Sequence, residues 1–145
     1  VTRAIVNYGG LWGNVSDEVL YFMGQTDSDG NLLDGKGTYK MHIEKENIPD
    51  KFVNAYWAMT LYTTPDYRFA QNKDQRYSIS HTWDVKTNPD GSMTFWISPE
   101  KPKNVPLGNW LATDPNKGFA ITFRIYVPKQ EVKDGKWFPT PIIKQ

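Results

Sequence analysis

The sequence predicts an all-β protein: an antiparallel, jelly-roll-like β-sandwich with a short N-terminal helix. Three observations predict this class. Aromatic residues make up 14% of the chain, eleven glycines and ten prolines interrupt it, and short runs of alternating apolar and polar residues lie between these breaks. Short strands with turns about 8–12 residues apart are typical of a sandwich or a jelly roll. The 145 residues suit a single domain, residues 1–145.

The N-terminal segment, residues 2–12, is the one helix that the pattern supports, and Gly9 and Gly10 end it. A short turn is expected from Ser16, because serine followed by aspartate suits an N-cap. The other elements are strands, each an alternating or a β-branched and aromatic run. In chain order they are residues 41–45, 52–63, 76–85, 92–97 and 119–127.

The run at 76–85 alternates strictly, so its odd-numbered residues from Tyr77 to Val85 should share one face. The segment that follows it, N-P-D-G at 88–91, is a turn signal. Pro89 presets φ, and Gly91 accepts a positive φ. The sequence therefore predicts a hairpin between the strands on either side of this turn.

Composition excludes several classes of function. Basic and acidic residues nearly cancel, 17 against 16, and are interspersed, which argues against nucleic acid as a partner. No apolar run approaches the roughly 20 residues of a membrane-spanning helix. The absence of cysteine excludes disulfides and a thiolate nucleophile. The chain begins V-T-R-A-I-V, without the features of a signal peptide, and a first residue of valine indicates a processed or trimmed chain.

Metal binding is not expected. Asp27, Asp29 and Asn31 fall at positions one, three and five of an EF-hand loop, but leucine stands at position six and Thr38 at position twelve. We interpret this segment as a polar double turn between strands at residues 21–23 and 38–41.

The two histidines also lack a metal motif. One residue separates His42 from Glu44, and His81 lies three residues before Asp84. Neither arrangement is the H-x-H cluster found in jelly-roll metal sites. We expect His81 to be a hydrogen-bonded residue near the edge of the core, and no cofactor.

No nucleophile signature is present. The serine of D-G-S-M-T lacks the second glycine of a nucleophile elbow, and Ser80 and His81 point to opposite faces of their strand. A pair of carboxylates is defined by its separation in space. A hydrolase of carbohydrates or esters therefore stays an alternative, working through a metal or through carboxylates such as Asp66, Asp84 or Asp114.

Seven blocks of the sequence carry a family resemblance. In order they are D-S-D-G-N-L-L-D-G-K-G-T-Y, A-Y-W-A-M-T-L-Y, N-K-D-Q-R-Y-S-I, D-G-S-M-T-F-W-I, N-W-L-A, F-R-I-Y-V-P and D-G-K-W-F-P-T-P-I-I. This ordered set, within residues 3–143, resembles the family called domain of unknown function 1214. In the N-W-L-A block, Ala112 replaces the family's proline.

The resemblance implies a jelly-roll-like sandwich that usually follows a second β domain, domain of unknown function 1254, in bacterial proteins that are often exported. The chain has no room for that partner, so we expect a stand-alone version of the domain or an excised fragment. An exported or periplasmic location is what the resemblance implies. The family brings no settled activity.

Six residues in the matching blocks are candidate ligand-binding residues: Tyr62, Arg76, Asn109, Trp110, Arg124 and Tyr126. If their strand faces converge, they form a pocket of hydrogen-bond donors on an aromatic wall. Guanidinium groups clamp carboxylates and flat rings stack on sugars. The structural interpretation is that the polar side chains pin loops and the rings fill the core. For Trp110 we expect a structural plug beside the pocket, and for Asn109 a role in fixing the turn.

We therefore expect a non-catalytic module that binds a carbohydrate or a small anion. The hydrolase described above is one alternative. A structural or assembly protein is the other, and it predicts a sizeable exposed apolar patch and a stable oligomer.

Overall fold

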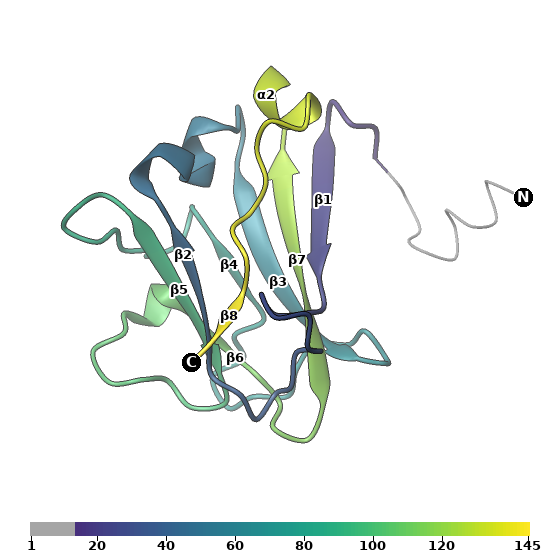
Figure 1. Ribbon diagram of the computed structural model, residues 1–145, viewed down its shortest axis with the longest axis vertical. Helices are drawn as coiled ribbons and strands as arrows, with labels where there is room; N and C mark the ends of the chain where they lie inside the picture. The colour runs from purple at the N-terminus through teal and green to yellow at the C-terminus, as the bar shows by residue number, and fades with distance from the viewer. Residues whose placement is uncertain (1–13) are drawn as a thin grey trace, which may run out of the picture.

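A computed structural model describes residues 14–145 of the protein (Figure 1). Within that range the chain forms mainly β-strands, with three 3-10 turns and one short helix. The strands are β1 (Val19–Gly24), β2 (Tyr39–Ile43), β3 (Trp57–Thr64), β4 (Ser78–Ser80), β5 (Met93–Ser98), β6 (Trp110–Ala112), β7 (Gly118–Tyr126) and β8 (Ile143–Lys144). The helical segments are η1 (Lys45–Asn47), η2 (Pro49–Lys51), η3 (Leu107–Asn109) and α2 (Gln130–Lys133).

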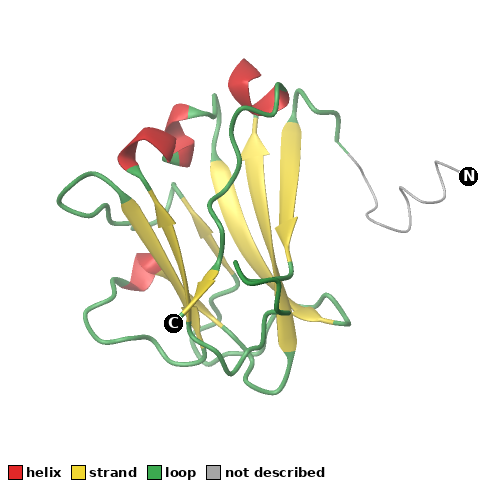
Figure 2. Ribbon diagram, in the orientation of Figure 1, coloured by secondary structure: helices red, strands yellow, loops and turns green. Residues whose placement is uncertain are grey.

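The strands form two four-stranded sheets that face each other as two layers (Figure 2). The first sheet has the order β1-β7-β3-β4, and all of its neighbours are antiparallel. The second sheet has the order β6-β5-β2-β8, and its β5–β6 pair is parallel. The structure therefore confirms a β-sandwich. It does not confirm a jelly roll, which is built from antiparallel Greek keys.

The core lies between the two sheets. Alternate residues of β3 point inward and are fully buried, among them Trp57 and Met59. Trp57 contacts Phe95 of the second sheet edge-on, with ring centroids 5.7 Å apart, and Tyr39 meets Phe119 across the same interface at 5.4 Å. Burying a side chain such as Phe95 contributes about 1.5–3 kcal/mol relative to exposure. The core therefore uses the inward side chains of both sheets, and the outward side chains can take part in binding.

Two predicted strands are shorter than expected. The run at 52–63 is a regular strand only from Trp57 onward, and before it there is an isolated bridge between Val53 and Pro128. The run at 76–85 is a strand only at Ser78–Ser80, because the chain turns after Ser80, whose carbonyl accepts a hydrogen bond from the Trp83 N–H at 2.9 Å. Trp83 consequently leaves the shared face and is 46% exposed.

The predicted turn at 88–91 is confirmed. Gly91 has φ of 85°, and the Asn88 and Ser92 backbones bond across the turn at 2.8 Å. Before the turn, the hairpin has a single bridge, Thr87 with Met93, in place of a full strand. The predicted N-terminal helix lies outside the described residues. Residues 14–145 contain no helix that is long and apolar enough to span a membrane.

Candidate functional site

The outward face of the first sheet carries the largest group of predicted site residues. Phe123 and Ile125 of β7 point into the core, so the alternation of the strand turns Arg124 outward. The strand pairing sets Arg124 beside Tyr21 of β1 and Ala58 of β3. Arg124 therefore stands in the middle of this face, with an aromatic neighbour on one side and a small one on the other.

Two hydroxyl groups hold the Arg124 side chain. Nη1 donates to Thr60 Oγ1 and Nη2 to the Tyr62 hydroxyl oxygen, both at 2.8 Å. The guanidinium carbon also lies 5.7 Å from the ring centroid of Tyr21 and 5.8 Å from that of Tyr62. These contacts fix the orientation of the cation between two rings, which attract it through their electron-rich faces.

The Arg124 charge has no carboxylate partner among residues 14–145. A guanidinium carries five N–H groups, and two of them make the bonds described above, which leaves three. Nη2 of Arg76 is buried and has no hydrogen-bond partner, but none of the nitrogens of Arg124 is in this position. Nε of Arg124 has no hydrogen-bond partner among the described residues and is not buried, so its N–H reaches solvent, where it can meet an anion.

Aromatic rings lie on either side of this arginine. Tyr62 stacks on Phe69 with centroids 5.6 Å apart, and Phe69 stacks on Tyr77 at 5.0 Å. Further along β7, Tyr126 stacks on Tyr56 at 4.0 Å. We call this surface the aromatic face; it consists of Tyr21, Tyr56, Tyr62, Phe69, Tyr77, Arg124 and Tyr126.

The aromatic face is open to solvent. Tyr21 is 49% exposed and Phe69 50%, while burial, followed by the neighbouring Tyr56, raises the pKa of the Tyr126 hydroxyl. Thr60 and Thr122 lie between the rings as a floor of small hydroxyl residues. Two cavities of the described chain lie elsewhere, one beside Phe22 and Phe138 and one beside Leu33 and Pro65. The surface is thus a platform rather than the pocket that the sequence suggested.

Arg76 is turned away from this platform. Its Nε donates to the backbone oxygen of Trp110 at 3.4 Å, and its guanidinium lies over the exposed ring of Trp83, 5.6 Å from the centroid. Partial burial lowers the pKa of Arg76. Because β6 belongs to the second sheet, Arg76 links the two sheets at their edge, and the two arginines do not form one pocket.

Asn109 and Trp110 are engaged in internal bonds. The Asn109 amide accepts from the Lys86 N–H at 2.8 Å and donates to the carbonyls of Lys86, at 2.8 Å, and Thr94, at 3.0 Å. Trp110 is 2% exposed, and its indole N–H donates to the backbone and hydroxyl oxygens of Ser98. Both side chains thus have structural roles: Asn109 ties the backbone at Lys86 to β5, and the Trp110 ring is buried in the interior.

The sequence also matches a known protein family. A family described as protein of unknown function (DUF1214) matches residues 18–130. The chain belongs to this family. No curated protein matches it.

Two crystal structures resemble the DUF1214 domain. The VPA0106 protein from Vibrio parahaemolyticus shares 27% sequence identity with a TM-score of 0.80, and the match covers 99% of this chain and 34% of the Vibrio chain. A putative uncharacterized protein from Burkholderia cenocepacia shares 16% identity with a TM-score of 0.52, over 88% of this chain and 29% of the other, and this second likeness concerns the fold. This chain therefore spans about a third of the length of these two proteins.

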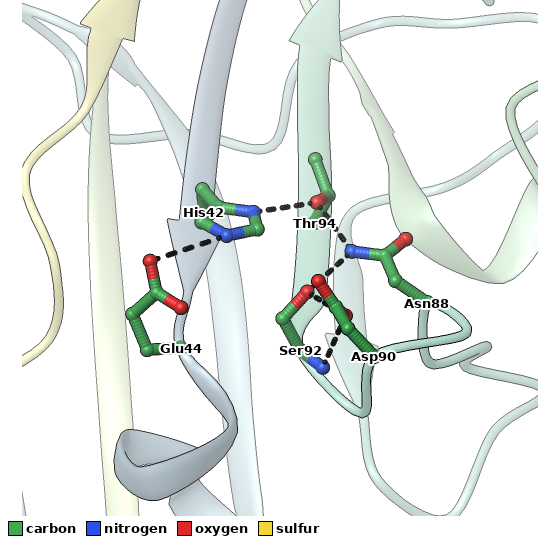
Figure 3. A network of polar contacts seen from close by, with 6 residues as sticks. All are labelled: His42, Glu44, Asn88, Asp90, Ser92 and Thr94. Carbon is green, nitrogen blue, oxygen red and sulfur yellow. Dashed lines mark hydrogen bonds and ion pairs between the residues drawn. The ribbon is translucent and has the colours of Figure 1, made fainter.

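A second polar group of the DUF1214 domain lies on the outward face of the second sheet (Figure 3). His42 Nδ1 is 3.0 Å from Thr94 Oγ1, and its Nε2 is 3.5 Å from Glu44. Asn88 donates to the hydroxyls of Thr94, at 3.0 Å, and Ser92, at 2.8 Å. We call these residues, with Asp90, the polar cluster; it ties the turn at 88–91 to β2 and β5.

Other candidates from the sequence have local partners. Asp27 Oδ1 accepts from the backbone N–H groups of Asp29 and Asn31, as expected of a polar turn. His81 Nδ1 accepts from the Trp57 N–H at 3.3 Å. Asp66 pairs with Lys117 at 2.7 Å. Residues 14–145 contain no group of three or more histidine or acidic side chains arranged to hold a metal.

The aromatic face includes residues that the sequence reasoning did not select. Phe69 lies in a loop, outside any alternating run, so only the bridge between Tyr62 and Phe69 brings it to the platform. Tyr21 is on a predicted strand, but it could have been placed beside Arg124 only with the register of β1 and β7 known. Neither position carried a recognisable sequence signal.

Proposed function

We propose that this domain is a non-catalytic carbohydrate-binding module and that the ligand lies on the aromatic face. The observation that supports this proposal most directly is the set of half-exposed rings around Arg124, with Tyr21 at 49% and Phe69 at 50% exposure. Single exposed apolar residues are ordinary, but a contiguous group on one sheet marks a binding surface.

The chemistry of the face suits a sugar chain. Aromatic rings provide flat apolar surfaces against which the C–H face of a sugar can pack, and the Tyr21 and Phe69 rings are both available. The Tyr62 hydroxyl and the Arg124 guanidinium supply hydrogen-bonding groups beside them. An open platform without a deep cavity accommodates an extended oligosaccharide better than a compact ligand.

A glycan array followed by calorimetry tests the proposal. Phe69→Ala removes a stacking ring and should weaken binding roughly tenfold, the effect of about 1.4 kcal/mol. Leu107→Ala is the matched control, because Leu107 is 53% exposed and belongs to η3, beside the second sheet. The proposal fails when no glycan binds at millimolar concentration, or when the control weakens binding as much as Phe69→Ala does.

Hydrolysis is the second candidate, and the polar cluster is the observation that favours it. Thr94, His42 and Glu44 form a hydroxyl–imidazole–carboxylate series, the arrangement that activates nucleophiles in acyl transfer. The His42–Glu44 distance of 3.5 Å is long, and Asn88 already donates to Thr94 Oγ1 at 3.0 Å as part of the turn, so binding is the preferred function. Turnover of p-nitrophenyl esters that Thr94→Ala and His42→Ala both abolish would reverse this preference.

A further inference from the structure

We propose that the ligand of the aromatic face is an acidic oligosaccharide and that Arg124 binds the carboxylate of one of its uronate residues. This inference rests on the proposed function and goes further, because it names the class of sugar. It starts from the charge of Arg124, which neutral sugar binding does not require.

The cation is unbalanced on its own face. The outward positions of the four strands around Arg124 are neutral, and none of them is acidic: Tyr21, Met23, Ala58, Thr60, Tyr62, Ser78, Ser80, Ala120, Thr122 and Tyr126. Arg124 itself is partly buried and has no ion pair within residues 14–145. A partly desolvated charge gains most from a partner of opposite sign, so an anionic ligand has the complementary chemistry.

The guanidinium is also held in place before any ligand arrives. Its bonds to Thr60 and Tyr62, both 2.8 Å, hold it between the rings of Tyr21 and Tyr62. A side chain that is already ordered loses less entropy on binding, and a guanidinium offers parallel N–H groups that match the two oxygens of a carboxylate. Arg124 is thus suited to recognise a carboxylate rather than to attract anions from a distance.

The single cation favours a carboxylate over sulfate groups. Among the outward strand positions of the first sheet, only Arg124 is basic. Polysulfated chains are recognised by clusters of basic residues, which this face does not have. One carboxylate for each bound segment, flanked by sugar rings that stack on Tyr21 and Phe69, fits one arginine between aromatic rings.

The experiment compares three oligosaccharides of equal length by calorimetry at low salt: an oligogalacturonate, its carboxyl-reduced neutral counterpart, and a sulfated neutral counterpart. The oligogalacturonate should bind at least tenfold more tightly than the reduced form. Arg124→Gln should abolish that difference, whereas Lys40→Gln should preserve it. Lys40 is the matched control because it lies over the Trp96 ring, at 6.0 Å, on the second sheet.

Each outcome decides between the two proposals. Equal binding of the oligogalacturonate and its reduced form overturns the inference but leaves carbohydrate binding intact. Sulfated chains that bind as tightly as the uronate, through Arg124, overturn the choice of carboxylate. Absence of binding for all three, or a dimer in sedimentation that Phe69→Ala dissociates, overturns both. If Arg124→Gln does not fold, as judged by circular dichroism, the comparison of sugars on the unaltered chain still decides.

Discussion

Replacing Asn109 with alanine should destabilise the fold without changing any ligand affinity. The Asn109 amide makes three hydrogen bonds to backbone groups, two with Lys86 and one with Thr94, at 2.8, 2.8 and 3.0 Å. The side chain is 97% covered, since the residue is 3% exposed. It holds the segment before the turn at 88–91 against β5, so its loss leaves that segment without a clip.

The magnitude follows from the bonds that are lost. Each contributes about 0.5–1.5 kcal/mol net, so three give about 3 kcal/mol. For a domain of this size that lowers the melting temperature by roughly 6–12 °C. Asn109→Asp should be at least as harmful, because a carboxylate then replaces the NH₂ group that donates to the carbonyls of Lys86 and Thr94.

Urea unfolding followed by tryptophan fluorescence measures the free energy of unfolding of each variant. Asn116→Ala is the control, because Asn116 is exposed and its hydrogen bond to Asp114 Oδ1 is donated by its backbone N–H. A loss below about 1 kcal/mol for Asn109→Ala would refute the reasoning that this amide is a clip. So would a variant of full stability that no longer binds a sugar, since it would return Asn109 to the binding site.

Two further predictions concern stability. Gly108→Ala should cost about 1–3 kcal/mol or more in urea unfolding, because its Cβ would lie 1.8 Å from the Asp84 carbonyl oxygen, whereas Gly24→Ala meets only an ordinary contact at 3.5 Å and should be nearly neutral. The pKa of Asp66 is lowered to about 2, first by the hydrogen bond from Lys117. Because this pKa is lower in the folded state than the unfolded value of 3.8, the ionised carboxylate stabilises the fold above pH 3.8. That stabilisation is lost as the pH falls toward 2. Acid titration should therefore show a smaller loss of stability between these values in Asp66→Asn; an unchanged titration would count against this role.

The local features were predictable because local rules produce them. The run at 92–97 was predicted as a strand and forms β5, in which Phe95 and Ile97 are buried, and the residue chemistry of N-P-D-G placed a turn where Gly91 takes a positive φ. Asn109 and Trp110, which the sequence placed among the candidate ligand-binding residues, make internal hydrogen bonds in the structure. The strand expected over 76–85 failed, because alternation cannot show that the chain leaves the sheet after Ser80.

The candidate site was predictable only in part. Arg124 and Tyr126 share a face, as alternation along one strand predicted, and the pairing of β3 with β7 brings Tyr62 to the same face. Arg76 contacts the other sheet instead. Its position depends on the irregular path of the chain before β4, which no periodic pattern describes.

By itself, the sequence determined a β-sandwich of short strands and family membership, since both depend on residue order and on the two-residue repeat of a strand. The tertiary structure alone decided which outward residues meet. Pairing of β1 and β3 with β7 set Tyr21 and Thr60 around Arg124, and a loop added Phe69. The absence of an acidic neighbour for Arg124 on that face is a property of strand register, and register depends on contacts between segments far apart in the chain.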